Sequence, residues 1–178
     1  SAASDVYKRQ GYSYNYNSVG GSIINNTIAS NSYSIRFNFE SAGNVMYALS
    51  KAANIRKNSN GEYAILGIPY AQYLKGEFDF AKNIRIDYRN SFAFHAGVGI
   101  AVPYGNAKTI PFEKQYFSGG ANSVRGWSVR DLGPGSFAGN GNLLDQSGDI
   151  KLDASIEYRS KLFWKSQRAV FIDAGNIW

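Results

Sequence analysis

The chain has 178 residues, of which 44% are apolar, 15% aromatic and 18% charged, and its formal net charge is +6. It contains no cysteine, which excludes disulfide scaffolds, thiol catalysis and cysteine-rich metal sites. No apolar run approaches the roughly 18 residues of a transmembrane helix, but a membrane β-barrel needs only alternating strands. Lysines and arginines are dispersed along the chain, which argues against nucleic-acid binding.

Residues 1–10 fit poorly with the rest of the chain, and we expect an unassigned segment or scar there. They carry no apolar core of a signal peptide, and the chain stops at Trp178 inside a strand pattern, so we expect truncation at both ends. Beyond residue 10, seven segments alternate between apolar and polar side chains and are bounded by turn residues. These segments are residues 11–18, 32–40, 44–50, 70–87, 91–102, 149–159 and 168–178.

The sixth segment shows the alternation most clearly. Its apolar side chains are those of Ile150, Leu152, Ala154, Ile156 and Tyr158. Facing the other way are Asp149, Lys151, Asp153, Ser155, Glu157 and Arg159. Strands of about ten residues that are apolar outside and polar inside are typical of outer-membrane barrels. We therefore predict an all-β, antiparallel transmembrane β-barrel, with a soluble β-sandwich as the alternative.

Turns at residues 41–43, 87–91 and 161–167 are predicted to share one end of this barrel. The glycine-rich insertion at residues 103–148 then lies at the opposite end. By the habit of such barrels, the short turns are periplasmic and the insertion is an extracellular loop. Irregular stretches of this length are normally functional or disordered.

Single residues outside the insertion carry weaker signals. His95 is the single histidine, and it falls among glycines on a polar strand face without an evident partner. We expect a space-filling polar residue rather than a catalytic base. Trp164 and Trp178 fall near opposite ends of the last hairpin, which favours interfacial aromatics, with simple packing as the alternative.

The insertion contains the segment 117–127, in which Gly119, Gly120 and Gly126 permit backbone angles closed to other residues. Its arginine, Arg125, presents a rigid fork of donors that suits a pair of carboxylates. Glu157 and Asp173 lie on the polar faces of the next two strands, so a loop folded inward brings them to Arg125. The alternative is that all three are ordinary solvated lumen residues.

The pattern of residues 117–127, aromatic-x-x-Gly-Gly-x-x-Ser-Val-Arg-Gly-aromatic, resembles the lumen-loop motif of the BamA/TamA outer-membrane assembly family, also called the bacterial surface antigen family. Phe171, Asp173 and Gly175 resemble its second motif, Phe-x-Asp-x-Gly. Residues 155–158 resemble the small-x-Glu-aromatic strand between the two motifs, and residues 132–135 resemble the usual continuation of the first.

This resemblance implies a sixteen-stranded barrel. Residues 11–178 form part of it, about seven strands. Arg125 is then expected to pack inside the barrel against Glu157 and Asp173, with Phe117 against the inner wall. The loop motif itself comprises Gly119, Gly120, Ser123, Val124, Arg125, Gly126 and Trp127. Trp127 is expected to pack against the inner wall as well.

The resemblance further implies insertion of β-barrels into the bacterial outer membrane, or protein translocation across it, without enzymatic activity, cofactor or metal. The implied partners are outer-membrane lipid, client barrels or secreted proteins, POTRA domains preceding this segment, and accessory lipoproteins or an inner-membrane partner. Two alternatives stay open besides the sandwich: a passive porin-like channel, and the barrel anchor of a fused patatin-like hydrolase. The branch of the family is not set by these residues.

Overall fold

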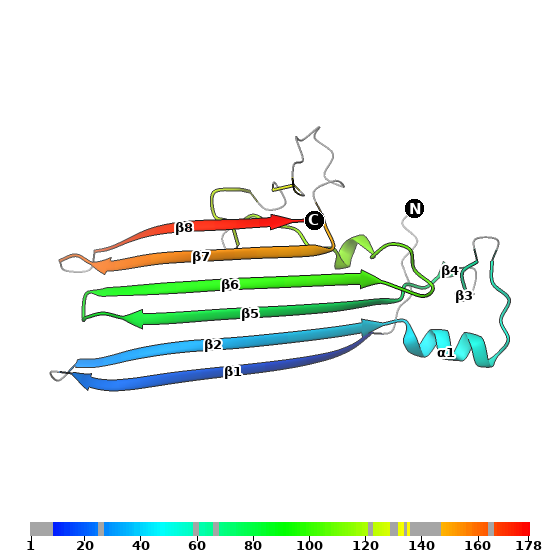
Figure 1. The fold of residues 1–178 in the computed structure, drawn as a ribbon, viewed down its shortest axis with the longest axis horizontal. Helices are drawn as coiled ribbons and strands as arrows, with labels where there is room; N and C mark the ends of the chain where they lie inside the picture. The colour runs from blue at the N-terminus through cyan, green and yellow to red at the C-terminus, as the bar shows by residue number, and fades with distance from the viewer. Residues whose placement is uncertain are drawn as a thin grey trace.

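The computed structural model describes residues 9–24, 27–58, 61–65, 68–120, 123–128, 132–133, 135, 147–163 and 166–178. Six long strands form one antiparallel sheet in the order β1-β2-β5-β6-β7-β8 (Figure 1). They are β1 (Arg9–Ile24), β2 (Thr27–Ala42), β5 (Tyr73–Arg85), β6 (Asn90–Pro103), β7 (Ile150–Lys161) and β8 (Gln167–Ile177). Each strand pairs with the next long strand along the chain, so the predicted all-β antiparallel architecture is confirmed, with β1 and β8 as the two edges.

One of the seven predicted strands is wrong. Residues 44–50 belong to the helix α1 (Asn44–Ala52), which begins after Gly43 turns the chain with a positive φ of 80°. Met46, Ala48 and Leu49 favour a helix. The apolar–polar alternation of residues 44–50 spans only seven residues, which is too short to outweigh that preference. No helix in the described ranges is long and apolar enough to cross a membrane.

Because residues 44–50 form a helix, one predicted turn lies at the other end of the sheet. Residues 41–43 lead into the connection between β2 and β5, which lies at the same end of the sheet as the long connection between β6 and β7 (Figure 1). At the other end, β5 joins β6 and β7 joins β8 through short turns, as predicted. β1 begins at Arg9, within the segment 1–10 for which no structure was predicted, and residues 1–8 lie outside the described part.

The two faces of the sheet differ sharply in chemistry. One cross-strand row joins Phe37, Phe78, Val98 and Leu152, and we call this side the outer face. The adjacent row on the opposite side joins Arg36, Asp79, Gly97, Asp153 and Gly175, and we call that side the inner face. Apolar side chains of the outer face are widely exposed. Ile172, for example, is 73% exposed, which suits an apolar surrounding better than water.

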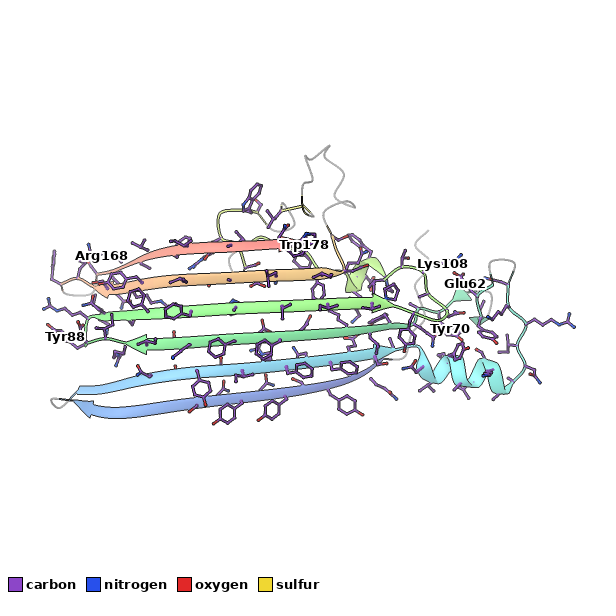
Figure 2. The ribbon with its side chains drawn as sticks, viewed as in Figure 1. Glu62, Tyr70, Tyr88, Lys108, Arg168 and Trp178 are labelled. Atoms are coloured by element: carbon purple, nitrogen blue, oxygen red, sulfur yellow. The ribbon has the colours of Figure 1, made fainter. Side chains whose placement is uncertain are left out.

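Buried residues gather on the inner face and at the end with the long connections. The core there consists of Ala42, Ala71, Tyr73, Ala101, Ile110 and Tyr116. Beside it lie α1, the short pair β3 (Ala64–Ile65) and β4 (Ile68–Pro69), and the 3₁₀ turn η1 (Phe112–Lys114). Asn106 ties this end together, since its side-chain amide donates to the carbonyls of Tyr63 and Tyr70 at 2.8 and 2.9 Å. Figure 2 places Tyr70, Glu62 and Lys108 at this end and Tyr88 at the other.

The last hairpin carries one of the two predicted interfacial tryptophans. Trp178 follows β8 at the end with the long connections and is 51% exposed, while Arg168 lies at the opposite end of the strand (Figure 2). The main chain of Trp178 exchanges hydrogen bonds with Ile150, both at 2.9 Å. Trp164 lies outside the described residues.

The turn between β5 and β6 gives a prediction about pH. Hydrogen bonds from the Asn90 side chain and from the Arg89 N–H hold the pKa of Asp87 below its ordinary value. The carboxylate therefore stabilises the turn above its unfolded pKa of about 3.9, and this contribution is lost as the pH falls through the lowered folded pKa. In Asp87→Ala we expect faster amide exchange than in wild type in residues 86–90 near neutral pH, measured by mass spectrometry, and a shrinking difference in acid.

Asp87→Asn is the control for this turn. It keeps a neutral acceptor but cannot titrate, so its difference from wild type in exchange should shrink in acid as the wild-type carboxylate becomes protonated. A difference between Asp87→Ala and wild type that grows as the pH falls would contradict the assignment.

Candidate functional site

The loop motif lies against the inner face as a compact turn. Gly120 N–H donates to the Trp127 carbonyl at 2.8 Å, and Trp127 N–H donates to the Val124 carbonyl at 3.2 Å. Gly119 has a φ of +106°, and a Cβ on it would lie 2.1 Å from the carbonyl oxygen of Ser128. Gly126 lies in the turn that the Trp127–Val124 hydrogen bond closes, but it has no positive φ and open space around it, so it uses no backbone angle that is special to glycine.

The structure brings Arg125, Glu157 and Asp173 together. Arg125 donates to Asp173 from Nε at 2.8 Å, from Nη2 at 2.7 Å and from its backbone N–H at 3.0 Å. Its Nη1 donates to Glu157. The guanidinium carbon also lies 3.7 Å from the centre of the Phe171 ring. We call Arg125, Glu157 and Asp173 the clamp.

The clamp is largely withdrawn from solvent. The side chain of Asp173 is 4% exposed and that of Glu157 13%, while Arg125 is 24% exposed. The hydrogen bond to Asp173 raises the pKa of Arg125 the most, and the hydrogen bond to Glu157 raises it further, so the guanidinium stays charged. Removing one partner of a buried ion pair costs roughly 3–5 kcal/mol, because the remaining charge is left unpaired. The clamp therefore favours a single position of the loop.

The loop can approach the inner face closely because Gly175 has no side chain. A Cβ on Gly175 would lie 2.7 Å from Cγ2 of Val124, which is buried in the motif. Ser123 contacts Ser118 through their hydroxyl oxygens at 3.2 Å. Phe117 and Trp127 stay 41% and 49% exposed, so these two side chains are only partly covered in the described part of the chain.

A second contact of the loop, centred on Tyr116, escapes the sequence analysis. The ring of Tyr116 lies over Gly99, where a Cβ would be 2.6 Å from its Cζ. Its hydroxyl donates to the carbonyl of Gly76 at 3.2 Å, and Nζ of Lys75 lies 4.1 Å from the ring centre. Burial and the nearby Glu77 raise the pKa of Tyr116, so its hydroxyl stays protonated as a donor. Isolated glycines such as Gly99 within a strand are the signal that could have indicated this contact.

His95 has partners that the sequence analysis did not find. Its Nε2 lies 3.6 Å from Oδ1 of Asp79, and its Nδ1 lies 3.5 Å from Oδ2 of Asp153. Gly97 leaves room for this arrangement, because both aspartates reach over its Cα. Lys151 in turn pairs with Asp153 at 3.3 Å.

Asp79, Asp153 and Lys151 line a polar cavity of about 330 Å³ between the inner face and residues 113–117. The described ranges hold no group of His, Cys, Asp and Glu that could bind a metal ion. Paired, hydrogen-bonded charges are what a positional anchor requires, and the arrangement can hold the loop on the sheet.

Comparisons with known proteins show what this chain is similar to. The family described as the Omp85 superfamily domain matches residues 25–178. The outer membrane protein assembly factor BamA of Neisseria meningitidis serogroup B is 37% identical over 86 residues, which cover 46% of this chain and 11% of that protein. The chain thus spans about a tenth of this relative. A crystal structure of BamA from Haemophilus ducreyi lacking POTRA domains 1–3 is 16% identical with a TM-score of 0.49, over 97% of this chain and 42% of that one.

The Tyr116 contact predicts a pair of opposite outcomes for two neighbouring glycines. Gly99→Ala places a methyl group against the Tyr116 ring and should displace it, so that the connection between β6 and β7 is cleaved faster by added protease. Gly76→Ala is the control, because nothing lies within 4 Å of its Cβ position. Equal cleavage of the two variants would contradict the contact, and Gly99→Ala should add nothing once Tyr116→Ala is present.

The motif predicts a similar contrast within the loop. Gly119→Ala combines a left-handed backbone with a clash against Ser128, and should destabilise the loop by at least about 1–2 kcal/mol. Gly126→Ala has neither problem and should behave like wild type. The measurement is the temperature at which the folded band disappears in a heat-modifiability gel. A larger drop for Gly126→Ala would show that the turn is built differently.

Proposed function

The chain belongs to the Omp85 superfamily, and we propose that it forms part of a β-barrel that inserts client barrels into the outer membrane or translocates proteins across it. Members of this family are bacterial outer-membrane proteins, and this chain is one of them. The observation that carries the proposal is the clamp, which ties a long loop to the inner face through two carboxylates from neighbouring strands.

A passive channel gives no reason for such a clamp. Its lumen must stay open to solutes, whereas here residues 113–120 and 123–127 lie over the inner face and are tied to it at Tyr116 and Arg125. A protein that handles other barrels has a different need, since it must keep its own wall intact while a client strand adds to an open strand edge. A loop held on the inside braces the strands that carry Glu157 and Asp173.

Within this proposal each residue has a positioning role. Asp173 accepts three hydrogen bonds from Arg125 and fixes the direction of the guanidinium fork. Glu157 joins β7 to the same fork and also accepts from Arg159. Gly175 and Val124 set how closely the loop approaches. Insertion by strand addition uses backbone hydrogen bonds and needs no nucleotide or cofactor.

The proposal extends to the organisation of the whole protein. Residues 11–178 would be one part of a sixteen-stranded barrel, with the connection 103–148 on the extracellular side. The relative from Neisseria is described as an assembly factor, and by analogy POTRA domains, accessory proteins and client barrels are the proposed partners. A barrel that anchors a fused hydrolase would share this sheet, and it would leave client barrels unaffected when the clamp is broken.

Breaking the clamp is the test of the proposal. In cells that depend on this protein, Arg125→Ala should lower the amounts of client barrels more than it lowers the amount of the folded variant itself. Both amounts are measured by immunoblot of outer membranes. The reason is that Asp173 and Glu157 lose their shared partner while the strands themselves remain paired. Arg125→Lys keeps the positive charge but lacks the fork of donors. Its client amounts should therefore lie between those of wild type and those of Arg125→Ala.

Arg36→Ala is the matched control. Arg36 is also an inner-face arginine, but its Nε donates to the side-chain amide oxygen of Asn15 and not to a carboxylate. Client amounts should stay near wild type in this variant. Normal client amounts in Arg125→Ala, with its own folding unchanged, would contradict the proposed function.

A further inference from the structure

The outer face carries an apolar groove of about 460 Å³ across β5, β6 and β7. Ala96 and Ala154, which pair directly across β6 and β7, form its floor. Phe80, Phe94 and Ile156 stand around them. Two small side chains facing each other among large ones leave a hollow, and its walls lose dispersion contacts unless an apolar group fills it.

A single charged side chain lines this groove. Lys82 is exposed on the outer face and pairs with Tyr33 on one side and Phe94 on the other. It lies two residues beyond Phe80 on the same strand face, toward the end with the short turns. A lysine there can extend its ammonium group to the membrane–water boundary while its methylene chain stays on the apolar surface.

The charge pattern of the outer face selects the occupant. In the described parts of the six long strands no aspartate or glutamate lies on this face, and its cations are Lys82 and Arg168, both toward the short turns. No ion pair to Lys82 occurs within the described ranges. The groove therefore offers an apolar channel directed toward the middle of the sheet and a positive charge near its short-turn end, between Phe80 and Ile84 along β5.

We propose that this groove binds a phospholipid with an anionic headgroup. One acyl chain lies over Ala96 and Ala154, and the phosphate group meets Lys82 in the leaflet at the short-turn end. An anionic headgroup complements the cation, and an acyl chain matches the lining, which a polar protein segment would not. The proposal depends on the outer face lying in a membrane and not on the activity proposed above.

Native mass spectrometry tests this site on the protein extracted from outer membranes in mild detergent. Micelles supply dioleoylphosphatidylglycerol or dioleoylphosphatidylcholine, which share their acyl chains and differ in headgroup charge. Lys82→Gln should lower bound phosphatidylglycerol about five-fold and lower bound phosphatidylcholine much less, because choline offsets the charge of the phosphate. Ala154→Leu fills the groove with an apolar side chain and should lower both lipids.

Two matched variants control for general effects. Lys51→Gln removes an exposed lysine of α1, and Val170→Phe enlarges an outward apolar residue of β8 outside the groove, so both should bind lipid like wild type. Heat-modifiable migration establishes that each variant is folded. Undiminished phosphatidylglycerol binding by folded Lys82→Gln or Ala154→Leu would overturn the proposal, as would a bound peptide mass in place of lipid.

Discussion

The contact between Arg125 and Asp173 is the interaction on which the arrangement of this molecule depends. Asp173 is almost fully buried and accepts three hydrogen bonds from one arginine, so neither group is stable there without the other. Antiparallel pairing of β7 with β8 sets Glu157 opposite Phe171, one inward position from Asp173, so both carboxylates and the ring reach the same guanidinium. The register of two strands thus fixes the place of a loop about 30 to 50 residues away in sequence.

Small residues are the counterpart of the clamp. Gly99 and Gly175 lie on the inner face directly beneath Tyr116 and Val124, and any side chain there would hold the loop away from the sheet. Gly97 does the same for the carboxylates around His95. Glycine weakens a strand, and here that cost is offset by contacts that only a bare backbone permits. The loop and the strand glycines form one packing unit, which neither forms alone.

The sequence predicted the long strands and their two faces because alternation is a local property. It did not predict α1, because residues 44–50 fit the apolar spacing of a strand as well as that of a helix. The helix preference of Met46, Ala48 and Leu49 prevailed there. It also missed the partners of His95 and Tyr116, which come from other strands and the loop. Arg125, Glu157 and Asp173 could be proposed as a cluster from the polar strand faces, and the family resemblance favoured it. Spacing alone left open that they are ordinary solvated lumen residues, since nothing local indicates that the loop folds inward.

The inner and outer features meet in the same part of the wall. Gly97 and Gly99 alternate along β6 with Ala96, and Asp153 precedes Ala154 on β7, so the strands that receive Tyr116 inside also carry the groove outside. A strand with glycine on one face and alanine on the other contributes little side-chain packing to its own stability. Contacts from the loop on one side, and from lipid on the other, supply what these strands lack. The stability of β6 and β7 therefore depends most on outside contacts where their side chains are smallest. The clamp, which lies on β7 and β8, holds the loop contact on the inner face in place.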